Sequence, residues 1–217
     1  MELFHTLNRG VDKRKIFLND RDRLRFINNL YVLNDEARVN NVYYHFTKNN
    51  DIASHYVKSQ LIHIHAFCFF FNHYHLLLSS IIENGISKFM KKINMAYAKY
   101  FNEKYDRVGT LFQGRYKSVH IEKEAHFIHI PIYIHCNPLD MFSPEWRDKK
   151  LNNLSQAVNF LNNYRWSSHL DYSGEVNFPS IISSNFLSDY FGGVNGYINK
   201  MSGWLGDLNL ESMNQYE

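Results

Sequence analysis

Two histidines and, much later in the chain, a tyrosine and an asparagine have the types and spacing of a metal-assisted nucleophilic site. His73 and His75 alternate within residues 72–78 (Asn-His-Tyr-His-Leu-Leu-Leu), and alternate side chains of a strand share one face. Tyr133 and Asn137 are four positions apart, so on a helix they also share a face. We therefore expect two imidazoles, an amide oxygen and a phenol to meet at one metal ion.

An H-x-H pair is a weak signal by itself. The chain has 12 histidines, and residues 63–65 (His-Ile-His) on the preceding predicted strand repeat the same pattern. Either pair could consist of ordinary half-buried histidines that bind no ion. The later Tyr133 and Asn137 favour the metal-site interpretation for His73 and His75.

Hydrophobic spacing predicts the elements that must position these residues. In order, we expect a strand at 3–8, a helix from 20 to about 37, a short strand at 42–46, strands at 61–70 and 73–80, an amphipathic helix at 86–101, a strand at 118–121 and a helix at 122–137. The strands at 61–70 and 73–80 form a hairpin that turns at Phe71-Asn72. This order predicts an α+β fold, a ferredoxin-like antiparallel sheet with helices packed on it.

The composition changes after Pro138 to asparagine, serine and aromatic residues. Helices are expected near 151–164 and 186–201. We interpret residues 1–140 as a catalytic domain and residues 141–217 as a helical C-terminal extension packed on the core.

Composition permits a nucleic-acid partner without requiring one. The formal net charge is +3 and the pI about 8.7, so any polyanion must contact a local patch. Cys68 and Cys136 form no recognisable disulfide framework, which indicates a reducing compartment. The first residues do not resemble a signal peptide, and the longest apolar run, 66–71, is too short to span a bilayer. We expect a cytoplasmic protein with no membrane partner.

Three motifs in order resemble those of the single-tyrosine HUH transposases of insertion sequences. They are 72–77 (Asn-His-Tyr-His-Leu-Leu), 112–118 (Phe-Gln-Gly-Arg-Tyr-Lys-Ser) and 133–138 (Tyr-Ile-His-Cys-Asn-Pro), supported by 8–10 (Asn-Arg-Gly) and 164–168 (Tyr-Arg-Trp-Ser-Ser). The resemblance covers about residues 4–172. Because the chain continues well past the tyrosine helix, it is most similar to the REP-associated tyrosine transposases.

The resemblance implies the HUH endonuclease fold and a specific chemistry. Tyr133 would attack a phosphodiester in single-stranded, hairpin-containing or palindromic DNA and form a 5′-phosphotyrosine. His73, His75 and Asn137 would bind one Mg²⁺ or Mn²⁺, and nitrogen ligands suit Mn²⁺ somewhat better. A phenol has a reference pKa of about 10, so it needs a nearby cation or base to attack.

Residues 107–117 interleave basic and aromatic side chains, a pattern typical of phosphate contact with base stacking. The candidate DNA-binding residues are Arg9, Arg14, Arg115, Tyr116 and Lys117. A solvated loop anchored to the core by its aromatic residues is an equal alternative for Phe112. Lys91, Lys92 and Lys99 are better interpreted as the solvated face of a helix.

Two features depart from the family pattern. Ile132 stands where many relatives have a basic residue, which puts one phosphate contact in doubt. Pro131 lies inside the predicted tyrosine helix, where it removes a backbone hydrogen bond, so we expect a kink or restart near Ile130.

Other functions and assembly states stay open at this point. The chain could be a domesticated nucleic-acid hairpin-binding protein without useful catalysis, or a metal-dependent phosphodiesterase in which water attacks. A homodimer that exchanges the tyrosine helix and a monomer are both compatible with the sequence.

Overall fold

A four-stranded antiparallel sheet forms the centre of the protein. The computed structural model describes residues 1–38, 59–122, 124–148, 151 and 153–207. The strands are β1 (Leu3–Arg9), β2 (Ile62–Phe69), β3 (His73–Ser80) and β4 (Lys117–Ile121), in the spatial order β2-β3-β1-β4. Every neighbouring pair is antiparallel. With α1 after β1 and α2 after β3, this is the ferredoxin-like α+β fold that the sequence predicts.

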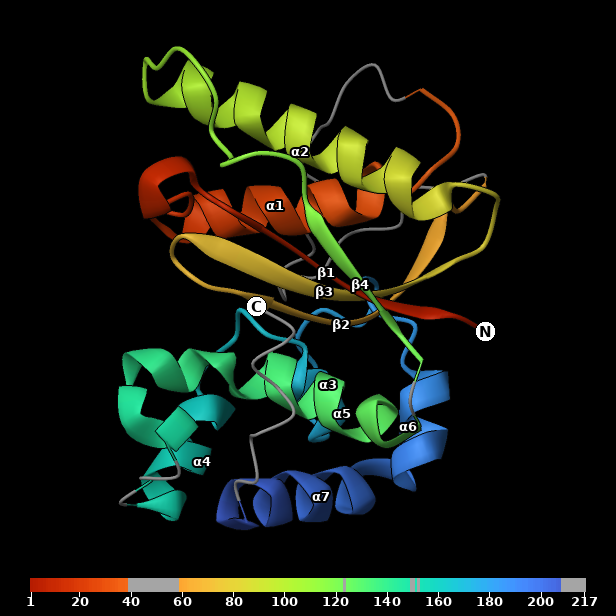
Figure 1. The fold of residues 1–217 in the computed structure, drawn as a ribbon, viewed down its shortest axis with the longest axis vertical. Helices are drawn as coiled ribbons and strands as arrows, with labels where there is room; N and C mark the ends of the chain where they lie inside the picture. The colour runs from red at the N-terminus through yellow and green to blue at the C-terminus, as the bar shows by residue number, and fades with distance from the viewer. Residues whose placement is uncertain (39–58, 123, 149–150, 152, 208–217) are drawn as a thin grey trace.

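Helices cover both faces of the sheet (Figure 1). On one face lie α1 (Asp20–Val32) and α2 (Gly85–Lys104). On the other lies α3 (Glu124–Cys136), followed by α4 (Leu154–Asn162), α5 (His169–Tyr172), α6 (Asn185–Phe191) and α7 (Gly193–Asp207). The helices after α3 thus lie on the same side of the sheet as α3. No helix within the described residues combines the length and apolarity needed to cross a membrane.

Each face of the sheet has its own hydrophobic core. The core under α1 and α2, here called the upper core, includes Phe17, Phe26, Phe69, Tyr74 and Tyr97. The core around α3, here called the lower core, includes Leu3, Leu77, Ile130, Ile134 and Trp146.

The alternation of side chains along β3 places the two candidate ligands. Tyr74, Leu76 and Leu78 belong to the upper core, and the Tyr74 hydroxyl donates to Asn94 Oδ1 at 2.6 Å. The residues between them must face the opposite way because a strand has a side-chain period of two. His73 and His75 therefore face the α3 layer.

The predicted helix from residue 20 ends earlier than expected. It ends at Val32 instead of about residue 37, because the polar groups of the next segment find partners elsewhere. The Asn34 side chain bonds both the N–H and the C=O of Ile62, and Lys92 Nζ donates to the carbonyls of Asp35, Glu36 and Ala37. The expected strand at 42–46 lies outside the described residues.

The other predicted boundaries differ by smaller amounts. The helix α3 continues through Pro131 without the restart expected near Ile130; the fully buried Ile130 and Ile132 hold its turns in the lower core. Residues 186–201 are two helices instead of one, since Gly192 and Gly193 adopt positive φ and end α6.

A buried carboxylate joins α1 to α2. Asp22 accepts hydrogen bonds from Lys104 Nζ at 2.6 Å, from the hydroxyl of Tyr105 at 2.8 Å and from the N–H of Leu18 at 2.8 Å. Burial alone would raise the pKa of Asp22, but the bonds from Lys104 and Tyr105 outweigh it and hold the pKa below its ordinary value. This depressed pKa stabilises the fold above the pKa of the unfolded chain.

We expect Asp22→Ala to lower the free energy of unfolding by about 3 kcal/mol at pH 7, because Lys104 loses its buried partner. Urea unfolding followed by circular dichroism measures the change. The matched control is Asp20→Ala, an exposed carboxylate on the same helix, which should cost less than about 1 kcal/mol. The difference from wild type should narrow below about pH 4, where Asp22 protonates in the unfolded chain. A difference that stays constant down to pH 2 would contradict this account.

Candidate nucleophile and metal site

The H-x-H pair is buried on the face of β3 that α3 covers. The rings of His73 and His75 have centroids 5.0 Å apart and are nearly perpendicular, at 80°. They are 6% and 3% exposed, so little of either ring is left in contact with water. The structure thus confirms that the two imidazoles share a face.

The Nδ1 atom of each histidine already has a polar partner. His73 Nδ1 lies 2.7 Å from Asn72 Oδ1, which can only accept, so Nδ1 carries the proton. His75 Nδ1 lies 2.8 Å from Nε2 of His5, a residue of β1 that the sequence analysis missed. With both Nδ1 atoms engaged, Nε2 is the atom that each ring would offer to an ion.

Burial keeps these rings neutral. It lowers the pKa of His73 to about 3, with a further contribution from the charge of Arg9. It also lowers the pKa of His75 well below the ordinary value, assisted by His73 and His5. A neutral imidazole at physiological pH retains the lone pair that metal coordination requires.

Tyr133 contacts this pair through His75 from the last turn of α3, and Asn137 follows one helical turn later. The Tyr133 ring packs edge-on against His75 and His5, with centroids 6.2 Å from each. Asn137 begins η2 (Asn137–Met141), directly after α3, and its Nδ2 donates to the Tyr133 carbonyl at 3.0 Å. The nucleophile candidate therefore contacts the histidines of its own chain.

Arg147, which no sequence pattern indicates, connects two of the predicted residues. Its Nη1 donates to the Tyr133 hydroxyl at 3.1 Å and its Nη2 to Asn137 Oδ1 at 3.0 Å. Asp140 holds the guanidinium through Nε at 2.9 Å. Neither Arg147 nor Asp140 has a sequence spacing that relates it to Tyr133, so only the chain path after α3 reveals them.

The donor set fits a hard divalent cation in part. Two neutral imidazoles and one amide oxygen leave positions for water and phosphate oxygen, as Mg²⁺ and Mn²⁺ prefer. The Asn137 oxygen already accepts from Arg147, but a carbonyl oxygen has a second lone pair. Within the described ranges, no three His, Cys, Asp or Glu side chains are grouped to hold an ion. The predicted set contains only two such residues.

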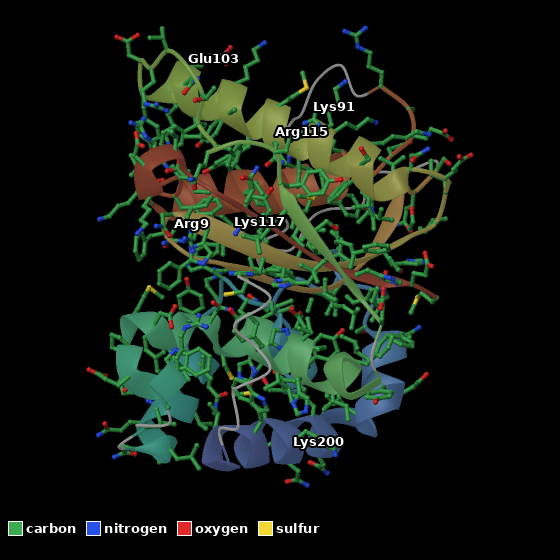
Figure 2. All side chains as sticks on the ribbon, in the orientation of Figure 1. Arg9, Lys91, Glu103, Arg115, Lys117 and Lys200 are labelled. Atoms are coloured by element: carbon green, nitrogen blue, oxygen red, sulfur yellow. The ribbon has the colours of Figure 1, made fainter. Side chains whose placement is uncertain are left out.

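A basic patch beside the candidate site is formed by β1 and β4 together with the segments that follow β1 and precede β4. Arg9, Lys13, Arg115 and Lys117 line a pocket of about 330 Å³. In Figure 2, Arg9 and Lys117 lie over the sheet, and Arg115 lies nearer α2. The structure thus brings three of the predicted DNA-binding residues together and adds Lys13.

The remaining predicted contacts are placed differently. Arg14 does not line this pocket, and Tyr116 is half-buried against the upper core. Phe112 is buried there too, which supports its role as an anchor of the loop. Lys92 is not the solvated residue that the sequence predicts, because its amine donates to carbonyls after α1, whereas Lys99 is exposed.

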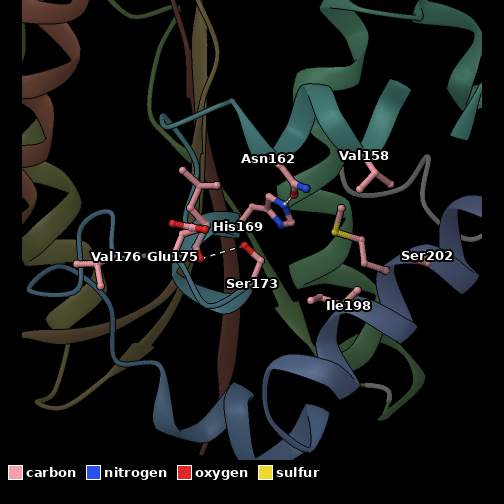
Figure 3. Close-up of a pocket in the computed structure, with 10 residues that line it drawn as sticks. Val158, Asn162, His169, Ser173, Glu175, Val176, Ile198 and Ser202 are labelled. Atoms are coloured by element: carbon pink, nitrogen blue, oxygen red, sulfur yellow. Dashed lines mark hydrogen bonds between the residues drawn. The ribbon is translucent and has the colours of Figure 1, made fainter. Parts of the chain in front are cut away.

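A separate pocket of about 290 Å³ lies between α4, α5 and α7 (Figure 3). His169 at its wall bonds Asn162 Oδ1 at 2.8 Å and the Tyr197 hydroxyl at 2.7 Å. The same hydroxyl lies 2.8 Å from Nδ1 of His135, so the His135 side chain bonds to the C-terminal helices. These hydrogen bonds connect α3 with α4, α5 and α7.

Comparison with known proteins gives a family match. Residues 32–137 match the family model described as IS200-like transposase. A solved structure of a REP-associated tyrosine transposase bound to a REP hairpin is similar over 85% of this chain and 86% of that chain, with 13% identity and a TM-score of 0.47. A similarity this low does not show that this chain shares the activity or the ligand of that protein. No curated protein sequence matches the chain.

Asn72 should control the metal affinity without being a ligand. Its Oδ1 fixes His73, and its Nδ2 donates to the Lys13 carbonyl at 3.1 Å. We expect Asn72→Ala to weaken Mn²⁺ binding about 10- to 100-fold, measured by electron paramagnetic resonance of free Mn²⁺. The control is Asn195→Ala, an exposed residue of α7, which should bind as wild type does. Equal affinities for both variants would show that Asn72 does not orient a ligand.

Proposed function

Because residues 32–137 of the chain belong to the IS200-like transposase family, we propose that it is a metal-dependent nickase and strand-transferase for single-stranded DNA that works through Tyr133. One observation carries the proposal. The phenol of Tyr133 packs against His75, on the same face of the sheet as His73, in a single chain. This arrangement supports the proposal, because a candidate nucleophile and two candidate metal ligands share one site.

The cleavage step is a transesterification. The Tyr133 oxygen forms a bond to phosphorus, and the bond from phosphorus to the 3′ oxygen breaks. The phenol loses its proton and the departing oxygen gains one, which leaves a 5′-phosphotyrosine and a free 3′-OH. Because the phosphodiester energy is kept, the 3′-OH of another strand end can reverse the step and join strands without ATP.

His73 and His75 through Nε2, and Asn137 through Oδ1, would hold one Mg²⁺ or Mn²⁺. When bound, the ion neutralises charge on a non-bridging phosphate oxygen. Residues of the chain itself position the ligands and the nucleophile. Asn72 and His5 fix the imidazoles, and α3 fixes the position of the Tyr133 oxygen. Proximity and orientation of this kind account for a large share of rate enhancement.

The basic patch would bind the DNA backbone next to the site. Arg9 is the antiparallel partner of His73 across β1 and β3, so a phosphate on Arg9 is a neighbour of the H-x-H pair. The net charge of +3 makes this local patch more important than the overall field. We propose single-stranded DNA with a hairpin or palindrome as the substrate, in keeping with the family resemblance.

The direct test is adduct formation. Wild type and Tyr133→Phe are incubated with a labelled library of single-stranded DNA hairpins and Mn²⁺, then separated on denaturing gels. We expect a covalent adduct with wild type only, abolished by EDTA, since phenylalanine has no nucleophilic oxygen. Tyr190→Phe, which changes an exposed tyrosine of α6, is the matched control and should form the adduct.

Two results would replace the proposal. Cleavage by Tyr133→Phe with the same products would indicate a phosphodiesterase that uses water. Hairpin binding by wild type without adduct or cleavage would indicate a binding protein without useful catalysis.

The basic patch gives a second prediction. Arg115→Gln combined with Lys117→Gln should weaken DNA binding and reduce the slope of log affinity against log salt by about 0.7 for each phosphate that the variant no longer neutralises. Fluorescence anisotropy at several salt concentrations measures both. Lys200→Gln, on α7 at the far edge of the layer that contains α3, is the control for the removal of a positive charge elsewhere (Figure 2). An equal effect per charge in the control would mean that binding depends on net charge and not on this patch.

A further inference from the structure

Arg147 connects the C-terminal extension to the candidate site. It lies in η3 (Pro144–Asp148), beyond the predicted end of the catalytic domain at residue 140. Its two terminal nitrogens reach two different residues of the site, the Tyr133 hydroxyl at 3.1 Å and Asn137 Oδ1 at 3.0 Å. The planar guanidinium of Arg147 therefore bonds to the candidate nucleophile and to the candidate amide ligand at the same time.

The guanidinium is itself fixed from several directions. Asp140 accepts from Nε at 2.9 Å and from Nη2 at 3.0 Å, which is the bidentate arrangement that orients an arginine most strongly. The Trp146 indole donates to the same carboxylate at 2.5 Å. The Cζ atom of Arg147 lies 4.8 Å from the centre of the Trp146 ring and 5.2 Å from that of Tyr133. We call Arg147 and Asp140 the Arg–Asp clamp.

We propose that the Arg–Asp clamp is a positioning device for the transesterification, in which Arg147 holds the Tyr133 oxygen and the Asn137 oxygen in register and Asp140 orients Arg147. The inference rests on the proposed function and extends it to residues of the C-terminal layer. A lysine cannot replace the arginine here, because a single ammonium lacks the planar fork that reaches both oxygens while bound to Asp140.

The clamp should affect the rate of reaction and the metal site more than DNA affinity. A displacement of about 1 Å from productive geometry can reduce a rate about 100-fold. Asn137 would also lose the partner that orients its amide, as a metal ligand does when its hydrogen-bonding neighbour is removed. The basic patch does not include Arg147. A variant without the clamp should therefore keep the wild-type affinity for the DNA backbone.

The test compares Arg147→Met, Arg147→Lys and Asp140→Asn with wild type on a hairpin that forms the adduct. We expect Arg147→Met to lower the single-turnover rate of adduct formation about 100-fold. Its DNA dissociation constant should stay within about 2-fold of wild type, and its Mn²⁺ affinity should fall about 10-fold. Arg147→Lys should recover less than a tenth of the missing rate, and Asp140→Asn should lie between wild type and Arg147→Met.

Arg165→Met is the matched control for removal of a stacked arginine. The Cζ atom of Arg165 lies 5.0 Å from the centre of the Trp166 ring and 5.1 Å from that of Phe178. Both rings belong to the upper core, on the other face of the sheet from Tyr133. Its variant should keep the wild-type rate and Mn²⁺ affinity. Thermal unfolding of every variant, followed by circular dichroism, shows whether a reduced rate of adduct formation is caused by loss of folded protein.

The outcomes separate this inference from the proposed function. Absence of an adduct with wild type would overturn the proposed function itself. An adduct with wild type and an equal rate with Arg147→Met would overturn only the clamp. Full rescue by Arg147→Lys would also overturn it, because a point charge would then be sufficient. A change confined to the DNA dissociation constant would make Arg147 a DNA contact instead of a positioning residue.

Discussion

The side-chain alternation of β3, fixed by its pairing with β1, is the constraint on which the site depends. Tyr74, Leu76 and Leu78 commit one face of the strand to the upper core, so the histidines between them must enter the lower layer. Buried imidazoles require polar partners, and the same register provides one, since it brings His5 of β1 within 2.8 Å of His75. A shift of one residue would exchange the two faces and remove both the core and the site.

The sequence predicted the sheet correctly, and it predicted the shared faces of four candidate site residues, because each of these depends on local spacing. His73 and His75 follow a period of two, and Tyr133 and Asn137 follow a helical turn. The residues that were missed depend on contacts between distant segments. His5 joins the site through strand pairing, and Asp140 and Arg147 join it because the chain folds back after α3. The predicted end of α1 was wrong for the same reason: beyond Val32, the Asn34 side chain bonds to Ile62 and Lys92 bonds to backbone carbonyls of the next segment.

The C-terminal helices are structurally continuous with the sheet. The lower core contains Leu3 and Leu77 from the strands, Ile130 from α3, and Trp146 and Trp204 from the extension, so apolar contacts cross the expected boundary at residue 140. The shared Tyr197 hydroxyl adds polar bonds between His135 of α3 and His169 of α5. The helix that carries Tyr133 is therefore packed on both sides, against the sheet and against the extension, which explains how it stays intact at Pro131.

Strand register also determines how DNA bound at the basic patch would reach Tyr133, the candidate nucleophile. Leu7 is paired with His75 on one side and with Lys117 on the other, so these three residues form a row across the sheet and their side chains share a face. Adjacent strands are about 4.8 Å apart, which separates the backbones at Lys117 and His75 by roughly 10 Å. A DNA backbone that runs from β4 to β3 crosses one strand, β1, where Arg9 lies opposite His73. Ile132, next to Tyr133 in the sequence, carries no charge, and the cation that contacts the phenol is Arg147. The basic residues that would bind the backbone and the arginine at Tyr133 therefore come from different parts of the fold, the first from the sheet and its flanking segments and the second from the segment after α3.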